Sequence, residues 1–338
     1  MGNDGAGAVA VDAVRAGAAA PAWRPLTTSD IPALTRLLAV AEQVDHTGEH
    51  QDEDDVADAL VVPGLDLPRD TIAAAQPDGE LVGFGVVRAP RAVRTEDRIF
   101  LHGTVHPAWR RQGLGRRLLD WTEQRAAQAH QERHPQLPGE YEVETYQQVG
   151  GRVALYERAG YRPVRWWNVM LRDVADPPRP KPVPDGLRLI AFDPAYDEAA
   201  RRAHNEAFAG HWGSSERDQA EWAKWFTGQR AFEPGSSFLI LDGDEIAAYL
   251  LAYFWAADAA ATGIREGFIG QLGTRPAWRR HGLASVLLDR ALVAFHAAGY
   301  QRAALNVDTD NASGALGLYL RHGYEVSERQ ITYVRPIT

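Results

Sequence analysis

The stretch that decides the fold occurs twice, as PAWRRQGLGRRLLD at residues 107–120 and as PAWRRHGLASVLLD at residues 276–289. In each copy an arginine-rich turn ends in glycine and opens an apolar helix. Backbone N–H groups at such a helix start point outward at the positive end of the helix dipole, which favours an anion. The small residues let a diphosphate approach the backbone closely, and the arginines supply charge. The repeat therefore predicts two copies of one phosphate-binding domain.

Composition limits the classes of protein to which this chain can belong. A length of 338 residues suggests about two domains, and 45% hydrophobic with 24% charged residues is ordinary for a soluble globular protein. The absence of cysteine excludes a disulfide framework, a thiolate nucleophile and a cysteine-based zinc site. The net charge of −9 argues against nucleic-acid binding. We expect a cytoplasmic protein with no metal and with no nucleic-acid or membrane partner.

Proline content and the repeat together predict the domain boundaries. Residues 1–20 contain acidic residues but no strong apolar run, so they are predicted to be a disordered tail and not a signal peptide. The segment VADPPRPKPVPDG at 174–186 carries five prolines, which favour a stiff extended linker. The predicted domains are therefore residues 21–173 and 187–338.

The same order of elements can be read in both halves. The first begins with a strand at 23–26, a helix at about 30–44 and a hairpin of strands at 71–75 and 81–87. The second has a strand at 187–191, helices at 195–208 and 215–226, and strands at 238–241 and 246–253. A further strand, at 99–103 or 268–272, precedes each repeated turn. This pattern indicates a mixed α/β layer architecture.

A dinucleotide-binding fingerprint and a P-loop are the rival explanations of the turns. Neither copy has the GxGxxG pattern, and the P-loop lysine is missing from both. The segments beyond each turn are more specific, because both contain a helix that ends in LYxxxGY, at residues 155–161 and 318–324.

A strand, an (Arg/Gln)-x-x-Gly-x-(Gly/Ala) turn, a helix, a strand and a helix ending LYxxxGY together resemble the GNAT (GCN5-related N-acetyltransferase) family. The resemblance covers residues 23–338 as two modules. It implies an α/β fold of two tandem GNAT-type domains. Each would have a central mixed, largely antiparallel sheet with a splayed parallel pair, flanked by helices. The expected arrangement is a monomer in which the two domains pair like a dimer.

The resemblance implies acetyl-CoA as co-substrate, with its pantetheine along the strand before the turn and its pyrophosphate in the turn. The residues it implies in the second module are Leu272, Gly273, Thr274, Arg279, Arg280, His281, Gly282, Leu283, Ala284, Ser285, Asn306 and Asn311. Those in the first module are Gly103, Thr104, Val105, Arg110, Arg111, Gly113, Leu114, Gly115 and Arg116.

The second module is predicted to carry the catalysis. Tyr319 occupies the family's general-acid position, and Glu266 is the candidate base because its strand parity matches that of Phe268, whereas Gln271 points the other way. The first module keeps Tyr156, which is predicted to be a packed aromatic.

The first module also departs from the second in three respects. It has Gln148 and Val143 where the second has Asn311 and Asn306. Its interval from Gly113 to Tyr156 is 43 positions, against 37 from Gly282 to Tyr319. These differences predict that the first module has a supporting role.

Three functions remain open from the residues. The first is N-acetyl transfer from acetyl-CoA to a primary amine of a small molecule. The second is a non-catalytic acyl-CoA-binding or regulatory protein. The third is acetylation of protein amines, which would need an open groove for the acceptor.

Overall fold

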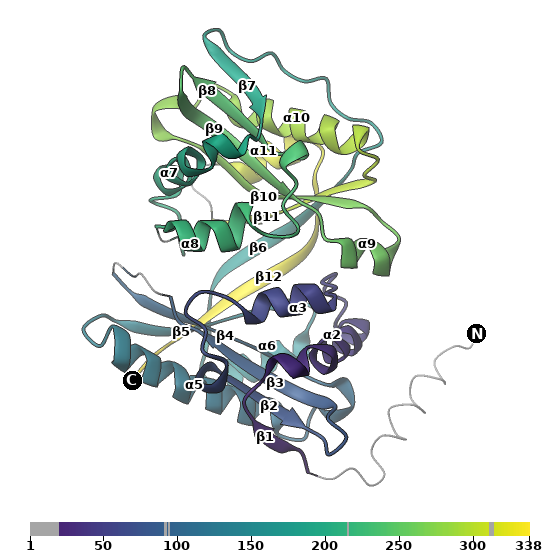
Figure 1. The fold of residues 1–338 in the computed structure, drawn as a ribbon, viewed down its shortest axis with the longest axis vertical. Helices are drawn as coiled ribbons and strands as arrows, with labels where there is room; N and C mark the ends of the chain where they lie inside the picture. Colours follow the sequence, from purple (N-terminus) through teal and green to yellow (C-terminus); the bar gives the residue numbers. More distant parts are fainter. Residues whose placement is uncertain (1–19, 91–92, 94, 215, 311–313) are drawn as a thin grey trace. The chain divides into compact units, whose positions relative to one another are not determined.

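The computed structural model describes residues 20–90, 93, 95–214, 216–310 and 314–338. These form two compact units (Figure 1), and each is described by itself. Unit 1 comprises residues up to Val164 together with Ile331–Thr338, and unit 2 comprises Arg165–Gln330. The predicted tail, apart from Ala20, lies outside the described residues. Among those described, no helix combines the length and apolar character needed to cross a bilayer.

Unit 1 is a sheet with helices on both faces. In order across the sheet, its strands are β1 (Ala22–Arg24), β2 (Thr71–Ala75), β3 (Leu81–Arg88), β4 (Asp97–Val105), β5 (Gly139–Tyr146) and the final part of β12 (Glu325–Pro336). Its helices are α2 (Ile31–Asp45), α3 (Glu53–Leu60), α4 (Leu67–Asp70), α5 (Leu114–Arg133) and α6 (Gly150–Arg158). Strands β4 and β5 are parallel, whereas β1–β2, β2–β3 and β3–β4 are antiparallel.

Unit 2 repeats this plan. In order across the sheet, its strands are the second part of β6 (Arg162–Asp173), β11 (Arg302–Asp308), β10 (Glu266–Thr274), β9 (Glu245–Tyr253), β8 (Phe238–Asp242) and β7 (Leu187–Ala191). Its helices are α7 (Asp197–Ala207), α8 (Gln219–Trp222), α9 (Ala256–Thr262), α10 (Leu283–Ala297) and α11 (Ala315–Arg321). Strands β10 and β11 are parallel, and their other neighbours are antiparallel. The predicted fold class is confirmed.

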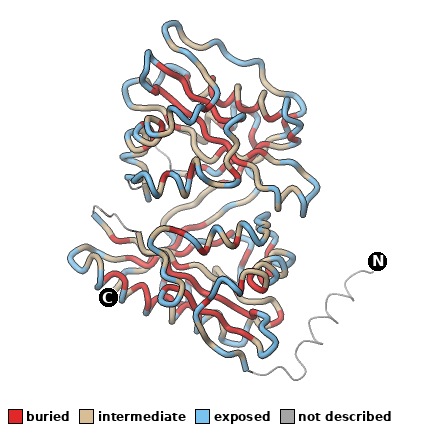
Figure 2. Tube along the Cα trace, viewed as in Figure 1, coloured by how far each residue is buried: buried red, intermediate tan, exposed pale blue. Residues whose placement is uncertain are grey.

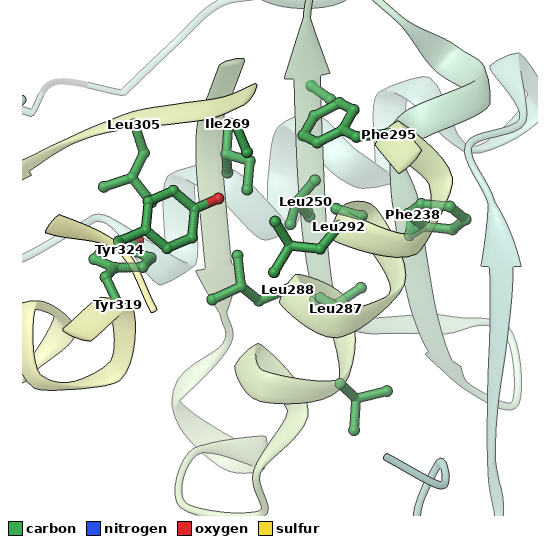
Figure 3. Close-up of a cluster of buried hydrophobic side chains, with 14 of the residues drawn as sticks. Phe238, Leu250, Ile269, Leu287, Leu288, Leu292, Phe295, Leu305, Tyr319 and Tyr324 are labelled. Atoms are coloured by element: carbon green, nitrogen blue, oxygen red, sulfur yellow. The ribbon is translucent and has the colours of Figure 1, made fainter. Parts of the chain in front are cut away.

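Buried residues are concentrated on the central strands of each sheet (Figure 2). In unit 1, α2 and α3 cover the face that bears Phe84 and Val86. Helix α5 covers the opposite face, where Gly85 lies against Leu118 and Thr122. In unit 2, α10 covers the face that bears Leu250 and Ile269 (Figure 3), and α7 and α8 cover the other face.

The proline-rich segment differs from its prediction. It was expected to separate two domains, but residues 165–173 on one side of it and 187–330 on the other belong to the same unit. The segment packs on that unit: Val174 is part of its core, and the Lys181 ammonium lies 3.1 Å from the Asp289 carboxylate. The chain passes from one unit to the other within β6, between Val164 and Arg165, and again within β12.

Several predicted elements are shorter or longer than their patterns indicated. The first predicted helix begins at Ile31 after a 3₁₀ turn at Thr28–Asp30. The helix predicted at 215–226 is split into α8 and a π-helical turn at Ala223–Thr227. The extra residues between turn and tyrosine in the first half accompany the longer α5, which has 20 residues where α10 has 15. That insertion is therefore remote from Tyr156.

Candidate functional site

Each unit contains one parallel strand pair that separates before its strands end. Strands β4 and β5 pair only from Asp97–Gly139 to Phe100–Glu142, although they continue to Val105 and Tyr146. In unit 2, β10 and β11 pair from Glu266–Arg302 to Ile269–Leu305 and continue to Thr274 and Asp308. The divergence leaves unpaired backbone groups facing a V-shaped split, which is the splayed pair that the family resemblance implied.

Each splayed strand leads into the repeated turn. Arg111 and Arg280 both adopt positive φ, of 64° and 66°. The helix-capping glycines Gly113 and Gly282 follow, with φ of 88° and 76°. Two left-handed residues separated by one other bend the chain so that the first amides of the helix face the split. The geometry is that of an anion site at a helix N-terminus.

The first arginine of each turn makes hydrogen bonds within the protein that hold the turn in place. Arg110 donates from Nε to the Val105 carbonyl at 3.0 Å, and Arg279 donates from Nε to the Thr274 carbonyl at 3.2 Å. The Arg110 guanidinium also makes a bidentate ion pair with Asp45, at 2.6 and 2.9 Å. Arg111 and Arg280 are exposed, so they are better placed to supply the charge that was expected of both arginines.

A pocket of about 530 Å³ lies in the split of unit 1. The predicted residues that line it are Gly103, Thr104, Val105, Arg110, Arg111, Gly113, Gly115 and Arg116. Leu114 is half-buried at the start of α5. Residues that the sequence reasoning missed also line the pocket: Asp45, His102, Arg152 and Arg158, together with Tyr156, which was expected to be a packed aromatic.

In unit 2 the predicted cofactor residues follow the corresponding course. Leu272, Gly273 and Thr274 form the splayed end of β10. Arg279, Arg280, His281 and Gly282 are exposed, Ala284 and Ser285 are half-buried, and Leu283 is part of the core. Asn306 is exposed on β11, and Asn311 lies outside the described residues.

The strand registers give the structural equivalence of the two units. Phe100 pairs with Arg88 and Glu142, and Phe268 pairs with Tyr253 and Ala304. Phe100 and Phe268 thus occupy the same place in their sheets, and their partners Glu142 and Ala304 correspond to each other. Two residues further along these strands, Glu144 corresponds to Asn306. The expected equivalence of Val143 with Asn306 is therefore wrong. Val143 is in the buried core, whereas Glu144 and Asn306 are both exposed.

A β-bulge in β10 corrects a second expectation. The pairing of β10 with β9 shifts between Ile269 and Gln271, so Gly270 is an extra residue that reverses the strand parity. Gln271 consequently lies on the same face as Phe268, and its Oε1 accepts a hydrogen bond of 2.9 Å from the Tyr253 hydroxyl. The prediction that Gln271 points the other way is wrong. Strand β4 has no such shift against β3, in residues that are all described.

Glu266 forms an ion pair with Arg302 at the first paired position of β10 and β11, three residues before the split begins. Burial raises the pKa of its carboxyl, and the Arg302 charge opposes that shift. The equivalent positions in unit 1 are Arg98 and Glu140, whose charged groups approach to 3.4 Å with the signs exchanged. The same two positions form an ion pair in both units, although the two charges are exchanged. This favours a structural role for Glu266 over that of a general base.

Tyr319 lies at the closed end of the split in unit 2. It belongs to the buried cluster that contains Ile269 and Leu305, the last paired residues of β10 and β11 (Figure 3). Its ring centroid is 6.0 Å from that of Tyr324. Burial raises the pKa of its hydroxyl to about 12, so the hydroxyl keeps its proton at neutral pH and can donate it. The geometry is compatible with the predicted general acid.

Tyr156 has the corresponding place in unit 1. Its ring centroid is 5.8 Å from that of Tyr161, and burial raises the pKa of its hydroxyl. His102, on the splayed part of β4, has its pKa lowered to about 3 by burial and by the charges of Arg88 and Arg152. His102 is therefore neutral near pH 7.

Comparison with known proteins gives the same family for both halves. A model described as "Acetyltransferase (GNAT) family" matches residues 198–324, and one described as "Acetyltransferase (GNAT) domain" matches residues 68–163. The mycothiol acetyltransferase of Catenulispora acidiphila is 30% identical over 265 residues, or 75% of this chain and 77% of the relative. That of Salinispora arenicola is 30% identical over 318 residues, or 92% and 94%.

Solved structures show a similar fold. A GCN5-related N-acetyltransferase from Sphaerobacter thermophilus has a TM-score of 0.73 and 26% identity, covering 94% of this chain and 95% of that one. A tandem GNAT protein from the clavulanic acid biosynthesis pathway has a TM-score of 0.71 and 15% identity, covering 94% and 98%. These similarities confirm the predicted family and its tandem arrangement.

Proposed function

Because the chain belongs to the GNAT family of acetyltransferases, we propose that it transfers the acetyl group of acetyl-CoA to the primary amine of a small molecule, with the chemistry in unit 2. The family supports acetyl-CoA as the donor. The relatives named mycothiol acetyltransferase support a small-molecule acceptor related to mycothiol.

The observation that carries the assignment to unit 2 is the residue four positions before each tyrosine. In α11 this residue is Ala315, and in α6 it is Arg152, which lines the pocket. Ala315 places a methyl group one helical turn before Tyr319, where unit 1 has the Arg152 guanidinium. A neutral acetyl thioester fits that environment better than it fits one with a guanidinium.

The reaction needs few groups from the protein. The amine nitrogen attacks the thioester carbonyl carbon, an N–C bond forms, the C–S bond breaks, and the sulfur leaves as a thiolate. Tyr319 would give its proton to that thiolate, the proton lost by the amine would pass to water, and water would return a proton to the Tyr319 phenolate. Backbone N–H groups on the splayed end of β10 would orient the thioester carbonyl, as the family resemblance implies.

Thiol release from acetyl-CoA, measured against a panel of primary amines, tests the proposal. The panel should include amino sugars, cysteinyl conjugates and lysine peptides. Turnover with a small amine is expected. Preferential turnover of the peptides would indicate a protein acetyltransferase instead, and tight binding of acetyl-CoA without turnover of any amine would indicate a non-catalytic binding protein.

Two matched glycine variants test the assignment to unit 2. A Cβ atom added at Gly113 or at Gly282 would meet no atom within 4 Å, but both residues have positive φ. Gly282→Val and Gly113→Val therefore strain the backbone of the two turns alike. We expect the Gly282 variant to lose most turnover and the Gly113 variant to keep it. The reverse result would move the chemistry to unit 1.

A further inference from the structure

Arg152 gives the unit 1 pocket a charge that the equivalent place in unit 2 lacks. Its side chain is 21% exposed, lies on the pocket-facing side of α6 with Tyr156, and is one turn before it. One guanidinium nitrogen, Nη2, lies 3.3 Å from the Thr104 hydroxyl and 3.5 Å from the Asp45 carboxylate. Both contacts are long for charge-assisted hydrogen bonds, which are normally 2.7–2.9 Å.

The charges around Arg152 do not balance. Among the described residues that line the pocket, Asp45 is the one carboxylate. Both of its oxygens are already held by Arg110, at 2.6 and 2.9 Å. The arginines that line the same pocket are Arg110, Arg111, Arg116, Arg152 and Arg158. Two guanidiniums thus share one buried carboxylate, an arrangement that a further anion would complete.

The position of Arg152 identifies which part of a ligand that anion would belong to. Arg152 touches Thr104, on the splayed part of β4, whereas the diphosphate cradle is at Gly113. The segment of a CoA thioester expected beside Thr104 is the pantetheine, which is uncharged. The diphosphate is therefore not the anion that Arg152 would bind. The anion that would complete the site lies near the acyl end of the ligand.

We propose that Arg152 makes the unit 1 site select a CoA thioester whose acyl chain carries a free carboxylate. This inference rests on the proposed function, since it assumes that CoA thioesters bind with their diphosphate at the repeated turn. A planar guanidinium binds a carboxylate through two parallel hydrogen bonds, which the neutral acetyl group cannot accept. The two units would then bind different acyl-CoA classes on one scaffold.

Binding by isothermal titration calorimetry tests the proposal on the full chain that carries Gly282→Val, so that unit 1 dominates the signal. The probes are carboxymethyl-CoA and carboxypropyl-CoA, which are stable thioethers, and the neutral ethyl-CoA. At least one carboxylate probe is expected to bind about tenfold more tightly than ethyl-CoA. Arg152→Gln should abolish that preference and leave ethyl-CoA binding unchanged. Arg152→Lys should keep part of the preference.

Other outcomes would overturn the proposal. Equal affinity for charged and neutral probes would do so, as would tighter ethyl-CoA binding by Arg152→Gln, which would mean that Arg152 blocks the split. A carboxylate effect reproduced by ethyl-CoA plus free propionate would place the anion on a separate molecule. Failure of every probe to bind unit 1 would overturn this inference but not the proposed function, because turnover by unit 2 is measured independently. Unchanged circular dichroism of each variant establishes that it is folded.

Discussion

The two units share a backbone plan and differ in the charges placed on it. Both have a parallel pair that splits after four paired residues and a turn closed by a left-handed arginine and glycine. Strand β5 carries Glu142 and Glu144 where β11 carries Ala304 and Asn306. Arg152 lines the unit 1 pocket, and Ala315 has the equivalent place in unit 2. The shared backbone therefore accepts charged and neutral residues at the same positions, and Arg152 is the difference that can give the units different ligands.

The two tyrosines offer the strongest way to break this comparison. Tyr319→Phe removes the proton donor proposed for the leaving thiolate, so kcat should fall by about a thousandfold. Tyr156→Phe should change kcat by less than about twofold, because unit 1 is not expected to carry the reaction. Steady-state thiol release at saturating acetyl-CoA measures both. A large loss in the Tyr156 variant alone would show that the active unit is the first.

The pH dependence of Tyr319 gives a check on its role. Burial raises its pKa to about 12, so the group stays protonated across the accessible range and should not produce an alkaline limb in kcat below about pH 10. A loss of kcat with a midpoint near pH 8 that disappears in Tyr319→Phe would contradict this assignment.

Glu142 and Ala304 provide a comparison in stability. Burial and the charge of Glu144 raise the pKa of Glu142 to about 7, against the opposing charge of Arg98. A carboxyl whose pKa is raised on folding stabilises unit 1 fully below its unfolded pKa of about 4.5, and this contribution is lost as the pH rises through 7. The loss is up to about 3 kcal/mol.

Amide hydrogen exchange can localise that effect. Between pH 5 and pH 8, the opening free energy of β5 should fall relative to that of β11, once exchange rates are corrected for intrinsic pH dependence. Glu142→Gln imitates the protonated form and should remove most of the difference. Equal pH dependence of β5 in the parent and variant chains would mean that Glu142 does not carry the effect.

The positive charge of Arg152 in unit 1 can be introduced at the equivalent position of unit 2, which is Ala315. Ala315→Arg places a guanidinium one helical turn before Tyr319, beside the proposed acetyl site. We expect kcat/KM for acetyl-CoA to fall by at least about tenfold, because the long side chain occupies the split and desolvates a charge there. Ala315→Leu is the control for size alone. If both variants match the parent, the residue at this position does not separate the units.

The smallest effect concerns the reversed ion pairs. Glu266→Arg and Arg302→Glu should each place like charges together and destabilise unit 2 by about 1 kcal/mol. The double variant recreates the order found in Arg98 and Glu140 and should recover stability in thermal unfolding. It should also retain most turnover. A double variant that is stable but inactive would instead support Glu266 as the general base.

The sequence was sufficient for features that depend on neighbouring residues. The turns, the hairpin of β2 and β3 and the tyrosine-bearing helices all follow from local patterns of glycine, proline and apolar residues. The bulge at Gly270 does not, because a single glycine in a strand can mark a bulge or merely a close packing contact. The resulting error in parity misplaced Gln271.

Distant contacts could not be predicted either. Asp45 reaches Arg110 across 65 positions of sequence, and nothing near Asp45 indicates this partner. Arg152 was open to prediction, since comparing the residues four positions before Tyr156 and Tyr319 reveals the substitution of alanine by arginine. The division at Val164–Arg165 has no local signal, because β6 is a continuous strand there.

The crossing of β6 and β12 between units has a consequence for biosynthesis. Residues 331–338 complete unit 1, yet the ribosome makes them only after all of unit 2. A nascent chain that has emerged as far as Asp173 therefore holds the edge of β5 without its final strand, and an unpaired edge is prone to association. The first unit would reach its full stability after the second, although it begins earlier in the chain. The order of synthesis and the order of completion are thus reversed.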